Sequence, residues 1–172
     1  MDFMTYIDKG GIIMYILLGL NIVGFTLMFF KLFQYIILDR RRMYLVVDIY
    51  NKLHLFDKDK KYMMGEDILR EKIATYESGL STIKIIASIS PLFGLLGTVI
   101  GVLFAFEAIS QQGLGDPTIF SSGISLALIT TVGGLVVAIP HYVGYNYLIG
   151  MLDKLEVKLT KEMNQVIYKE RL

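Results

Sequence analysis

Three threonine hydroxyls lie inside long apolar stretches of the chain. Thr98 lies in SPLFGLLGTVIGVLFAF, residues 90–106, whereas Thr130 and Thr131 lie in GISLALITTVGGLVVAIPHYVGYN, residues 123–146. Neither stretch contains Asp, Glu, Lys or Arg, and this length and composition are typical of membrane-spanning helices. A hydroxyl in lipid is costly unless it faces another helix or water. The threonines therefore indicate helix faces that line something other than lipid.

The depths of two of these threonines are similar. Counting at about 1.5 Å per residue places Thr98 about 12 Å from the outer end of its span and Thr131 about 16 Å from the start of its own. A polar ring formed by Thr98 and Thr131, with Thr130 beside it, is one interpretation. The other is that each hydroxyl bonds to a carbonyl one turn earlier in its own helix.

No carboxylate lies inside the expected spans. A proton-driven machine normally needs a titratable group within the membrane, and His141, toward the cytoplasmic side, is the only internal candidate. Glu107 lies at the outer edge of its span. If protons cross here, we expect the carboxylate to come from another polypeptide.

A hydrophobic content of 54% places the chain in the membrane class. A first span is expected over 12–38, which is long enough to cross a bilayer. Lys31 lies near its far end, and we expect its amine to extend toward the interface. Residues 1–11 are expected to form a short interfacial segment that Gly10 and Gly11 break.

Positive charge predicts the orientation. Arg40, Arg41 and Arg42 directly follow the first span, and residues 39–81 hold nine of the 17 Lys and Arg, whereas 107–118 holds none. By the positive-inside rule, the N-terminus is expected outside and the C-terminus in the cytoplasm.

The expected fold is an all-α membrane protein with three transmembrane helices, the second and third of which extend into the cytoplasm. The extensions are predicted from apolar stripes with helical spacing, Leu69, Ile73, Tyr76, Leu80 and Ile83 before the second span and Leu148, Leu152, Leu155, Leu159, Met163 and Val166 after the third. The first stripe predicts one unbroken helix that enters the second span. The two stripes are expected to pack together, within a subunit or between subunits.

We divide the chain into an outer segment (1–11), span 1 (12–38), a cytoplasmic insert (39–84), span 2 (85–106), an outer loop (107–118), span 3 (119–149) and a cytoplasmic tail (150–172).

Small residues indicate close helix contacts, because they let helix backbones approach each other. Such contacts are either intramolecular or homo-oligomeric. The glycines concerned are Gly94, Gly97 and Gly101, the last two of which form a G-x-x-x-G motif, together with Gly133 and Gly134. Pro91 and Pro140 are expected to kink their helices.

Several classes of protein are disfavoured. With no cysteine there is no disulfide framework and no thiolate metal site. A net charge of +1 gives no case for nucleic acid binding. The Gly113–Asp116 sequence matches the G-x-G-D pattern of intramembrane aspartyl proteases, but that chemistry needs two facing aspartates, and a turn is the preferred interpretation. We therefore expect no enzyme, no cofactor and no metal site.

The second and third spans resemble the MotA/TolQ/ExbB proton-channel family. The residues that carry the resemblance are the run from Ser90 to Val99, SPLFGLLGTV, and the run Ala127-Leu128-Ile129-Thr130-Thr131, continuing with Gly134-Leu135 and Ala138-Ile139-Pro140 to Tyr145-Asn146. The three-span topology with the N-terminus outside is similar to ExbB and TolQ, whereas MotA proteins have four spans.

This resemblance implies a pentamer whose second and third helices line a central pore, with Thr98 and Thr131 as polar pore residues. It also implies an ExbD- or TolR-like partner that supplies an intramembrane aspartate, and a TonB- or TolA-like protein that is energised. The sequence departs from the family at Leu126, where ExbB proteins often carry a glutamate, and at His141, where a small or apolar residue is common. An ExbB-like task is expected first, a TolQ-like task second, and a non-conducting membrane scaffold is a further alternative.

Overall fold

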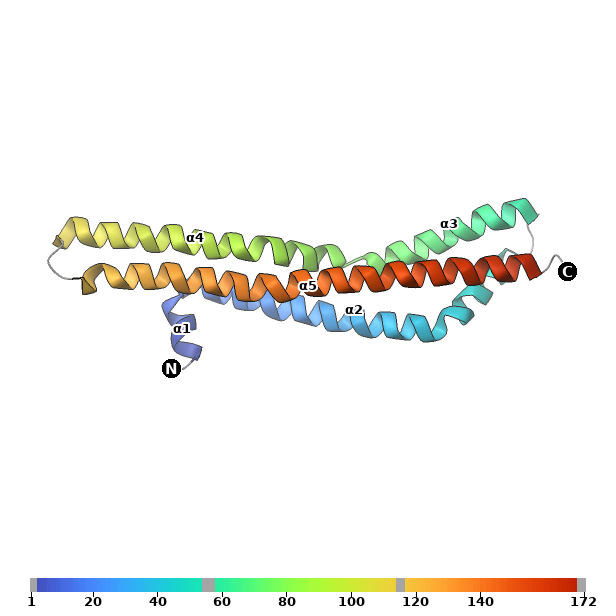
Figure 1. The fold of residues 1–172 in the computed structure, drawn as a ribbon, viewed down its shortest axis with the longest axis horizontal. Coiled ribbons are helices and arrows are strands. Elements are labelled where there is room, and N and C mark those ends of the chain that lie inside the picture. The colour runs from blue at the N-terminus through green and yellow to red at the C-terminus, as the bar shows by residue number, and fades with distance from the viewer. Residues whose placement is uncertain (1–2, 54–57, 114–116, 170–172) are drawn as a thin grey trace. The chain divides into compact units, whose positions relative to one another are not determined.

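The computed structural model describes residues 3–53, 58–113 and 117–169, and within these ranges the chain is helical and contains no strand. Five helices follow one another along the chain (Figure 1). Their bounds are α1 Phe3–Lys9, α2 Gly11–Lys52, α3 Lys58–Glu77, α4 Leu80–Gln112 and α5 Thr118–Lys169. Three stretches are long and apolar enough to span a membrane, namely Gly11–Lys52, Met63–Gln111, which includes parts of both α3 and α4, and Phe120–Tyr168.

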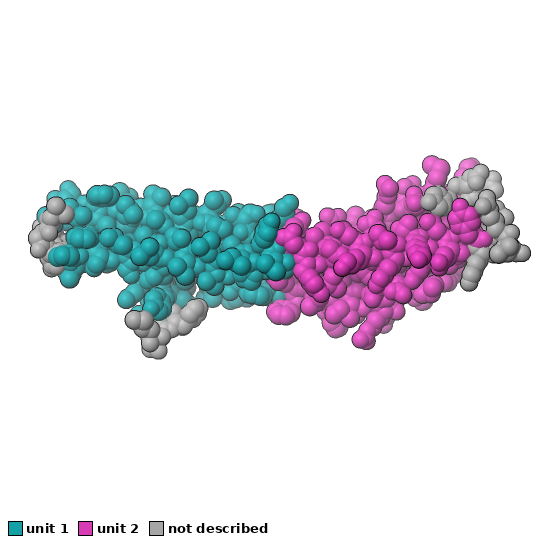
Figure 2. Space-filling view, in the orientation of Figure 1, with its two compact units in different colours: residues 1–27, 82–144 teal, residues 28–81, 145–172 magenta. Residues whose placement is uncertain are grey.

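The helices form two compact units, which Figure 2 colours separately. Unit 1 comprises residues 1–27 and 82–144, and unit 2 comprises residues 28–81 and 145–172. α2, α4 and α5 each contribute residues to both units.

Unit 1 contains α1, the first part of α2, most of α4 and the first part of α5. Its buried cluster consists of Ile13 and Leu17 from α2, Ile86 from α4 and Val137 from α5. Large apolar side chains remain exposed on α4, including Leu92, Leu95, Val99, Leu103 and Phe106. An exposed apolar surface of this kind is suited to lipid or to neighbouring helices rather than to water.

Unit 2 contains the rest of α2, all of α3 and the second part of α5. Both predicted apolar stripes contribute buried residues here, on α3 and the start of α4 (Leu69, Ile73 and Leu80) and on α5 (Leu148, Leu152, Leu155, Leu159 and Met163). Leu53 and Met163 both lie against Gly65 of α3. Both stripes are therefore buried within unit 2, and Met163 of the second stripe lies against α3, while direct packing of the two stripes stays a prediction.

The expectation of one unbroken helix into the second span is wrong. α3 ends at Glu77 and α4 begins at Leu80, and Gly79 between them has a φ of +89°. The Ser78 amide donates to the Ala74 carbonyl at 3.1 Å, which closes the last turn of α3. A left-handed residue directly after a helix is usually glycine, because glycine has no Cβ to clash.

The expected interfacial position of Lys31 also needs correction. Only 6% of the Lys31 surface is exposed, and its amine donates to the Tyr76 carbonyl and to Gln34 rather than extending to solvent. The predicted break after the N-terminal segment is present, because α1 ends at Lys9 and Gly11 has a φ of +60°.

The all-α class and three helices capable of spanning a membrane are confirmed. The orientation of the termini and the seven segment boundaries stay predictions. Parts of four segments lie outside the described residues, namely 1–2 of the outer segment, 54–57 of the insert, 114–116 of the outer loop with the G-x-G-D aspartate, and 170–172 of the tail.

Candidate functional site

Glycines bring α4 and α5 into backbone contact within unit 1. A methyl group at Gly94 would lie 2.9 Å from the Thr130 carbonyl oxygen, and one at Gly134 would lie 2.6 Å from the Ser90 carbonyl oxygen. Gly101 faces the carbonyl of Gly123 in the same way. These small residues therefore hold the two helices at a distance that larger side chains would not permit.

The close approach brings two threonine hydroxyls together. The Oγ1 atoms of Thr98 on α4 and Thr131 on α5 are 2.5 Å apart, and both side chains are half-buried. Thr98 Oγ1 also lies 3.2 Å from the Gly94 carbonyl oxygen, and Thr131 Oγ1 lies 3.1 Å from the Ala127 carbonyl oxygen. The similar depths counted from the sequence therefore correspond to direct contact between the hydroxyls.

This arrangement has two alternative hydrogen-bond directions. A hydroxyl donates one hydrogen bond and accepts others. Thr98 can donate to Thr131 while Thr131 donates to the Ala127 carbonyl, or Thr131 can donate to Thr98 while Thr98 donates to the Gly94 carbonyl. The pair can thus orient a proton donor toward either helix, but it does not hold a charge near neutral pH.

Thr130 lies apart from this pair. It is fully buried, and its hydroxyl donates to the carbonyls of Leu126 and Ala127 on its own helix. A methyl group at Gly97 would collide with the Thr130 side chain. The expected pore-lining position of Thr130 is therefore replaced by a packing position between α5 and α4.

Gly133 contacts a different helix from the other glycines. A methyl group there would lie against the side chains of Met14 and Leu17 on α2. The intramolecular alternative thus accounts for the contacts of Gly94, Gly97, Gly101, Gly133 and Gly134 in the described chain. α4 and α5 continue as helices through Pro91 and Pro140, so the kinks stay predictions.

His141 is buried at the contact between α5 and α2 in unit 1. Its Nδ1 donates to the Val137 carbonyl at 2.7 Å, whereas Nε2 has no hydrogen-bond partner within the described chain. The ring packs 4.9 Å from that of Phe25, and a side chain at Gly24 would overlap it. His141 lies ten residues beyond Thr131 on α5, about 15 Å along the helix. The structure therefore does not bring His141 to the threonine pair.

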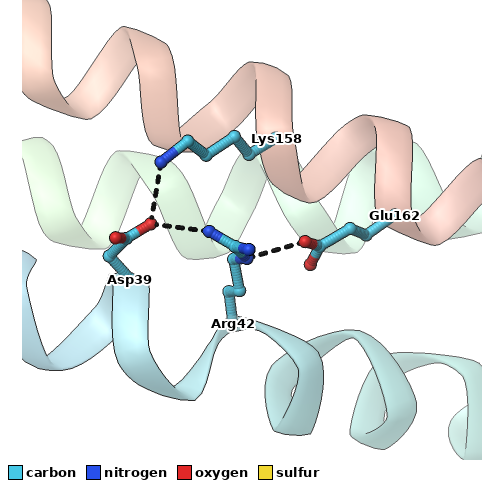
Figure 3. A network of polar contacts seen from close by, with 4 residues as sticks. All are labelled: Asp39, Arg42, Lys158 and Glu162. Atoms are coloured by element: carbon cyan, nitrogen blue, oxygen red, sulfur yellow. Dashed lines mark hydrogen bonds and ion pairs between the residues drawn. The ribbon is translucent and has the colours of Figure 1, made fainter.

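A polar network in unit 2 joins α2 to α5 (Figure 3). Lys158 Nζ lies 3.1 Å from Asp39 Oδ1. Arg42 Nη1 lies 3.0 Å from the same oxygen, and Arg42 Nε lies 2.6 Å from Glu162 Oε1. Arg42 thus links the two carboxylates. The hydrogen bonds from Lys158 and from Arg42 outweigh the opposing desolvation and lower the pKa of Asp39 below its ordinary value. Of the three arginines expected to set topology, Arg42 enters this network, whereas Arg40 and Arg41 are exposed.

Sequence reasoning had no signal for the pairs between α2 and α5 in this network, because these partners lie more than 100 positions apart, as Asp39 and Lys158 do. No group of three or more His, Cys, Asp or Glu side chains in the described ranges is arranged to hold a metal ion.

The fold and the site together define a polytopic α-helical membrane protein with a glycine-packed helix pair and a polar hydroxyl contact within its apolar spans. The particular family follows from comparison with known proteins. The chain belongs to the MotA/TolQ/ExbB proton channel family, whose family model matches residues 49–161.

Individual relatives agree with this assignment. The chain is 34% identical over 114 residues to the biopolymer transport protein exbB1 of Vibrio cholerae, an alignment that covers 66% of this chain and 50% of the relative. It is 43% identical over 70 residues to the biopolymer transport protein ExbB of Aquifex aeolicus, with 41% and 47% covered. It is 38% identical over 80 residues to the Tol-Pal system protein TolQ of Haemophilus influenzae, with 46% and 35% covered. The chain thus spans half or less of the length of each of these relatives.

Proposed function

We propose that this chain is a bacterial inner-membrane subunit of a motor driven by the proton motive force, with an ExbB-like task in energising TonB-dependent outer-membrane transport. The observation that carries the proposal is the 2.5 Å contact between the Thr98 and Thr131 hydroxyls in an uncharged helix pair. The family membership and the ExbB-named relatives support it.

The proposed assembly is a homo-oligomer, a pentamer by resemblance to the family. Span 2 and span 3 would surround a central pore, with the N-terminus outside and the C-terminus in the cytoplasm. Support comes from the exposed apolar side chains of α4 and from the partly exposed Thr98 and Thr131. Thr130 is not part of the proposed pathway because it is buried inside the chain.

The motor needs a second polypeptide in this proposal. A group that alternates between charged and neutral forms can capture the membrane potential, at about 2.3 kcal/mol per charge per 100 mV. The threonine hydroxyls cannot do so, and Leu126 stands where many ExbB proteins have a glutamate. We therefore assign the titratable aspartate to an ExbD- or TolR-like partner helix in the pore. The threonine pair would orient water or a proton donor toward that helix.

The test is proton flux into liposomes that contain the chain with an ExbD-like partner from the same organism, followed with an internal pH dye. Thr98→Val and Thr131→Val each remove one hydroxyl and preserve shape. We expect each to lower flux about tenfold, because a hydrogen bond between membrane helices is worth up to about 1.7 kcal/mol and 1.4 kcal/mol corresponds to a factor of ten. Serine at either position retains the hydroxyl and should retain the flux.

Thr26→Val is the matched control. Thr26 lies on α2 of the same unit, and among the described residues its hydroxyl bonds only to the Ile22 carbonyl one turn earlier. This variant should conduct like the wild type. Full flux in both Thr98→Val and Thr131→Val would exclude the pathway, and no flux with the partner present would favour a membrane scaffold. Substantial flux from the chain alone would contradict the two-protein mechanism.

A TolQ-like task in envelope maintenance is the second candidate, and the match to TolQ of Haemophilus influenzae favours it. Complementation separates the two tasks. An ExbB-like subunit restores TonB-dependent iron uptake to a strain that lacks ExbB and TolQ, whereas a TolQ-like subunit restores detergent resistance to it.

A further inference from the structure

A basic pocket lies between α2 and α5 in unit 2. It encloses about 210 Å³ and opens to the surface of the unit. Its lining combines charged and apolar side chains, namely Tyr35, Ile36, Asp39 and Arg40 from α2 and Met151, Lys154, Leu155 and Lys158 from α5. The pocket lies where the apolar part of α2 ends, at the boundary between the span expected over 12–38 and the insert that follows it.

The charges of this basic pocket favour an anion. Three cations, Arg40, Lys154 and Lys158, and one carboxylate, Asp39, line it, so the net charge of the lining is +2. Asp39 is already engaged by Lys158 and Arg42. Arg40 and Lys154 are exposed, and neither forms an ion pair or a hydrogen bond with another side chain of the described chain. Two cations are therefore available at the mouth of the pocket.

On both helices, an apolar side chain of the basic pocket comes before the cation in the sequence. Ile36 precedes Arg40 by one turn on α2, and Met151 precedes Lys154 by one turn on α5. Residues spaced by three or four lie on the same face of a helix. Because the apolar residues come first on both helices, the surface changes from apolar to basic in the direction of the expected cytoplasmic side.

We infer that this basic pocket binds an anionic phospholipid, with its phosphate between Arg40 and Lys154 and its acyl chain over Ile36 and Met151. Guanidinium and ammonium groups form strong charge-assisted hydrogen bonds with phosphate oxygens, and anionic lipids of the cytoplasmic leaflet attract basic residues that flank a span. A soluble phosphate would use the same cations but not the adjoining apolar surface. The inference rests on membrane insertion and not on proton flow, so it stands or falls independently of the proposed motor.

Arg41 provides a comparison at the same depth. It lines a separate pocket with Gln34, Ile37, Leu38, Tyr44, Leu45 and Tyr76, in which it is the only cation. If general attraction to the membrane surface were the whole effect, Arg41 and Arg40 would contribute equally to lipid preference. A specific pocket predicts that only Arg40 contributes strongly.

Native mass spectrometry of the full chain in uncharged detergent tests the inference. The delipidated chain is titrated with dioleoyl-phosphatidylglycerol or with dioleoyl-phosphatidylcholine, and the lipid-bound fractions are compared. The test variant is Arg40→Gln/Lys154→Gln. The matched control is Arg41→Gln/Lys161→Gln, which also removes one arginine of α2 and one lysine of α5, both exposed. Thermal melts followed by circular dichroism establish that both variants are folded.

We expect the wild type and the control to prefer phosphatidylglycerol and the test variant to lose at least about tenfold of this preference. Inorganic phosphate or glycerol 3-phosphate at the lipid concentration should not displace the lipid. Equal losses in test and control variants would overturn the inference, as would the absence of a preference in the wild type. If glycerol 3-phosphate displaces the lipid, the assignment of a lipid as the ligand would be overturned, and the pocket would be assigned to a soluble phosphate ester instead.

Discussion

The amine of Lys31 on α2 donates to the carbonyl oxygen of Tyr76 near the end of α3, at 3.0 Å. The Tyr35 hydroxyl donates to the same oxygen, also at 3.0 Å. The last four carbonyls of a helix have no partner within the helix, and the end of the helix carries partial negative charge. The Lys31 amine and the Tyr35 hydroxyl of α2 thus supply hydrogen-bond donors to a carbonyl in the last turn of α3 within unit 2, directly before the turn at Gly79.

Lys31→Met should therefore destabilise unit 2. The substitution preserves most of the apolar stem but removes a charged donor, and hydrogen bonds to charged groups contribute about 1.5–3 kcal/mol. Thermal unfolding in detergent, followed by circular dichroism, measures the effect. Lys52→Met is the control, because Lys52 is exposed and pairs with Asp48 one turn away, an interaction worth about 0.3–0.5 kcal/mol. Equal losses in the two variants would contradict the role of Lys31.

Periodicity predicted the buried stripes but not the break between α3 and α4. Tyr76 and Leu80 are four positions apart, so the stripe keeps its helical spacing across the turn that contains Gly79. The Ser78-Gly79 dipeptide is a turn signal, and it was the only local indication that the helix ends there. The spacing of apolar residues alone does not distinguish one helix from two that share a face.

Local sequence also gave the depth of Thr98 and Thr131 but not their contact. Their hydroxyls meet because Gly94 and Gly134 allow the two backbones to approach, which depends on the relative rotation of two helices. The partners of Lys31 could not be predicted for a similar reason, because Tyr76 lies 45 positions away. Residue types and their order determine what each helix can bury, whereas the choice of partner arises from tertiary packing.

The contact between His141 and Gly24 predicts a position where alanine is not tolerated. A methyl group at Gly24 would overlap the buried imidazole, and overpacking typically costs about 1–3 kcal/mol. The gain in helix preference from Gly to Ala, about 0.5–1 kcal/mol, does not offset this. Gly24→Ala should therefore lower the melting temperature in detergent.

Gly19→Ala on the same helix is the matched control for Gly24→Ala. A methyl group at Gly19 would meet no other helix of the described chain within 4 Å, so this variant should be as stable as the wild type or more stable. The double variant Gly24→Ala/His141→Ala makes room for the methyl group, and the two substitutions should therefore be non-additive. A stable Gly24→Ala single variant would exclude tight packing of His141 at this contact.

The lowered pKa of Asp39 predicts a pH dependence. A carboxyl whose pKa is lower in the folded state stabilises the fold above its ordinary pKa, 3.8, and loses this contribution as the pH falls through the lowered value. Asp39→Asn should therefore be less stable than the wild type at pH 7, and the difference in melting temperature should disappear well below pH 3.8. A difference that grows in acid would contradict this sign.

Lys158→Gln tests the cause of the lowered pKa, because the hydrogen bond from Lys158 is the largest contribution to it. This variant should reproduce much of the Asp39→Asn effect at pH 7, and the double variant should add little. The effect is expected to be at most about 1 kcal/mol, since both side chains are about half exposed to solvent. Added salt should reduce it further.

The contacts of two glycines predict unequal costs for the same substitution. A methyl group at Gly101 would meet the backbone of α5, namely the Gly123 carbonyl and, at 2.7 Å, the Ala127 amide nitrogen. One at Gly133 would instead meet the flexible end of the Met14 side chain on α2. Backbone atoms cannot move aside without separating the helices, whereas Met adopts other rotamers at low cost. Gly101→Ala should therefore cost about 1–3 kcal/mol, and Gly133→Ala should stay within about 1 kcal/mol of the wild type.

Thermal melts and native mass measurement of the same samples separate intramolecular packing from assembly. If Gly101 acts only between α4 and α5 of one chain, Gly101→Ala lowers the melting temperature, and the mass of the remaining folded complex is unchanged at low temperature. If the glycine instead supports a contact between subunits, the complex dissociates under conditions in which each chain stays helical. The close contacts of Gly101 with Gly123 and Ala127 on α5 of the same chain lead us to expect the lowered melting temperature.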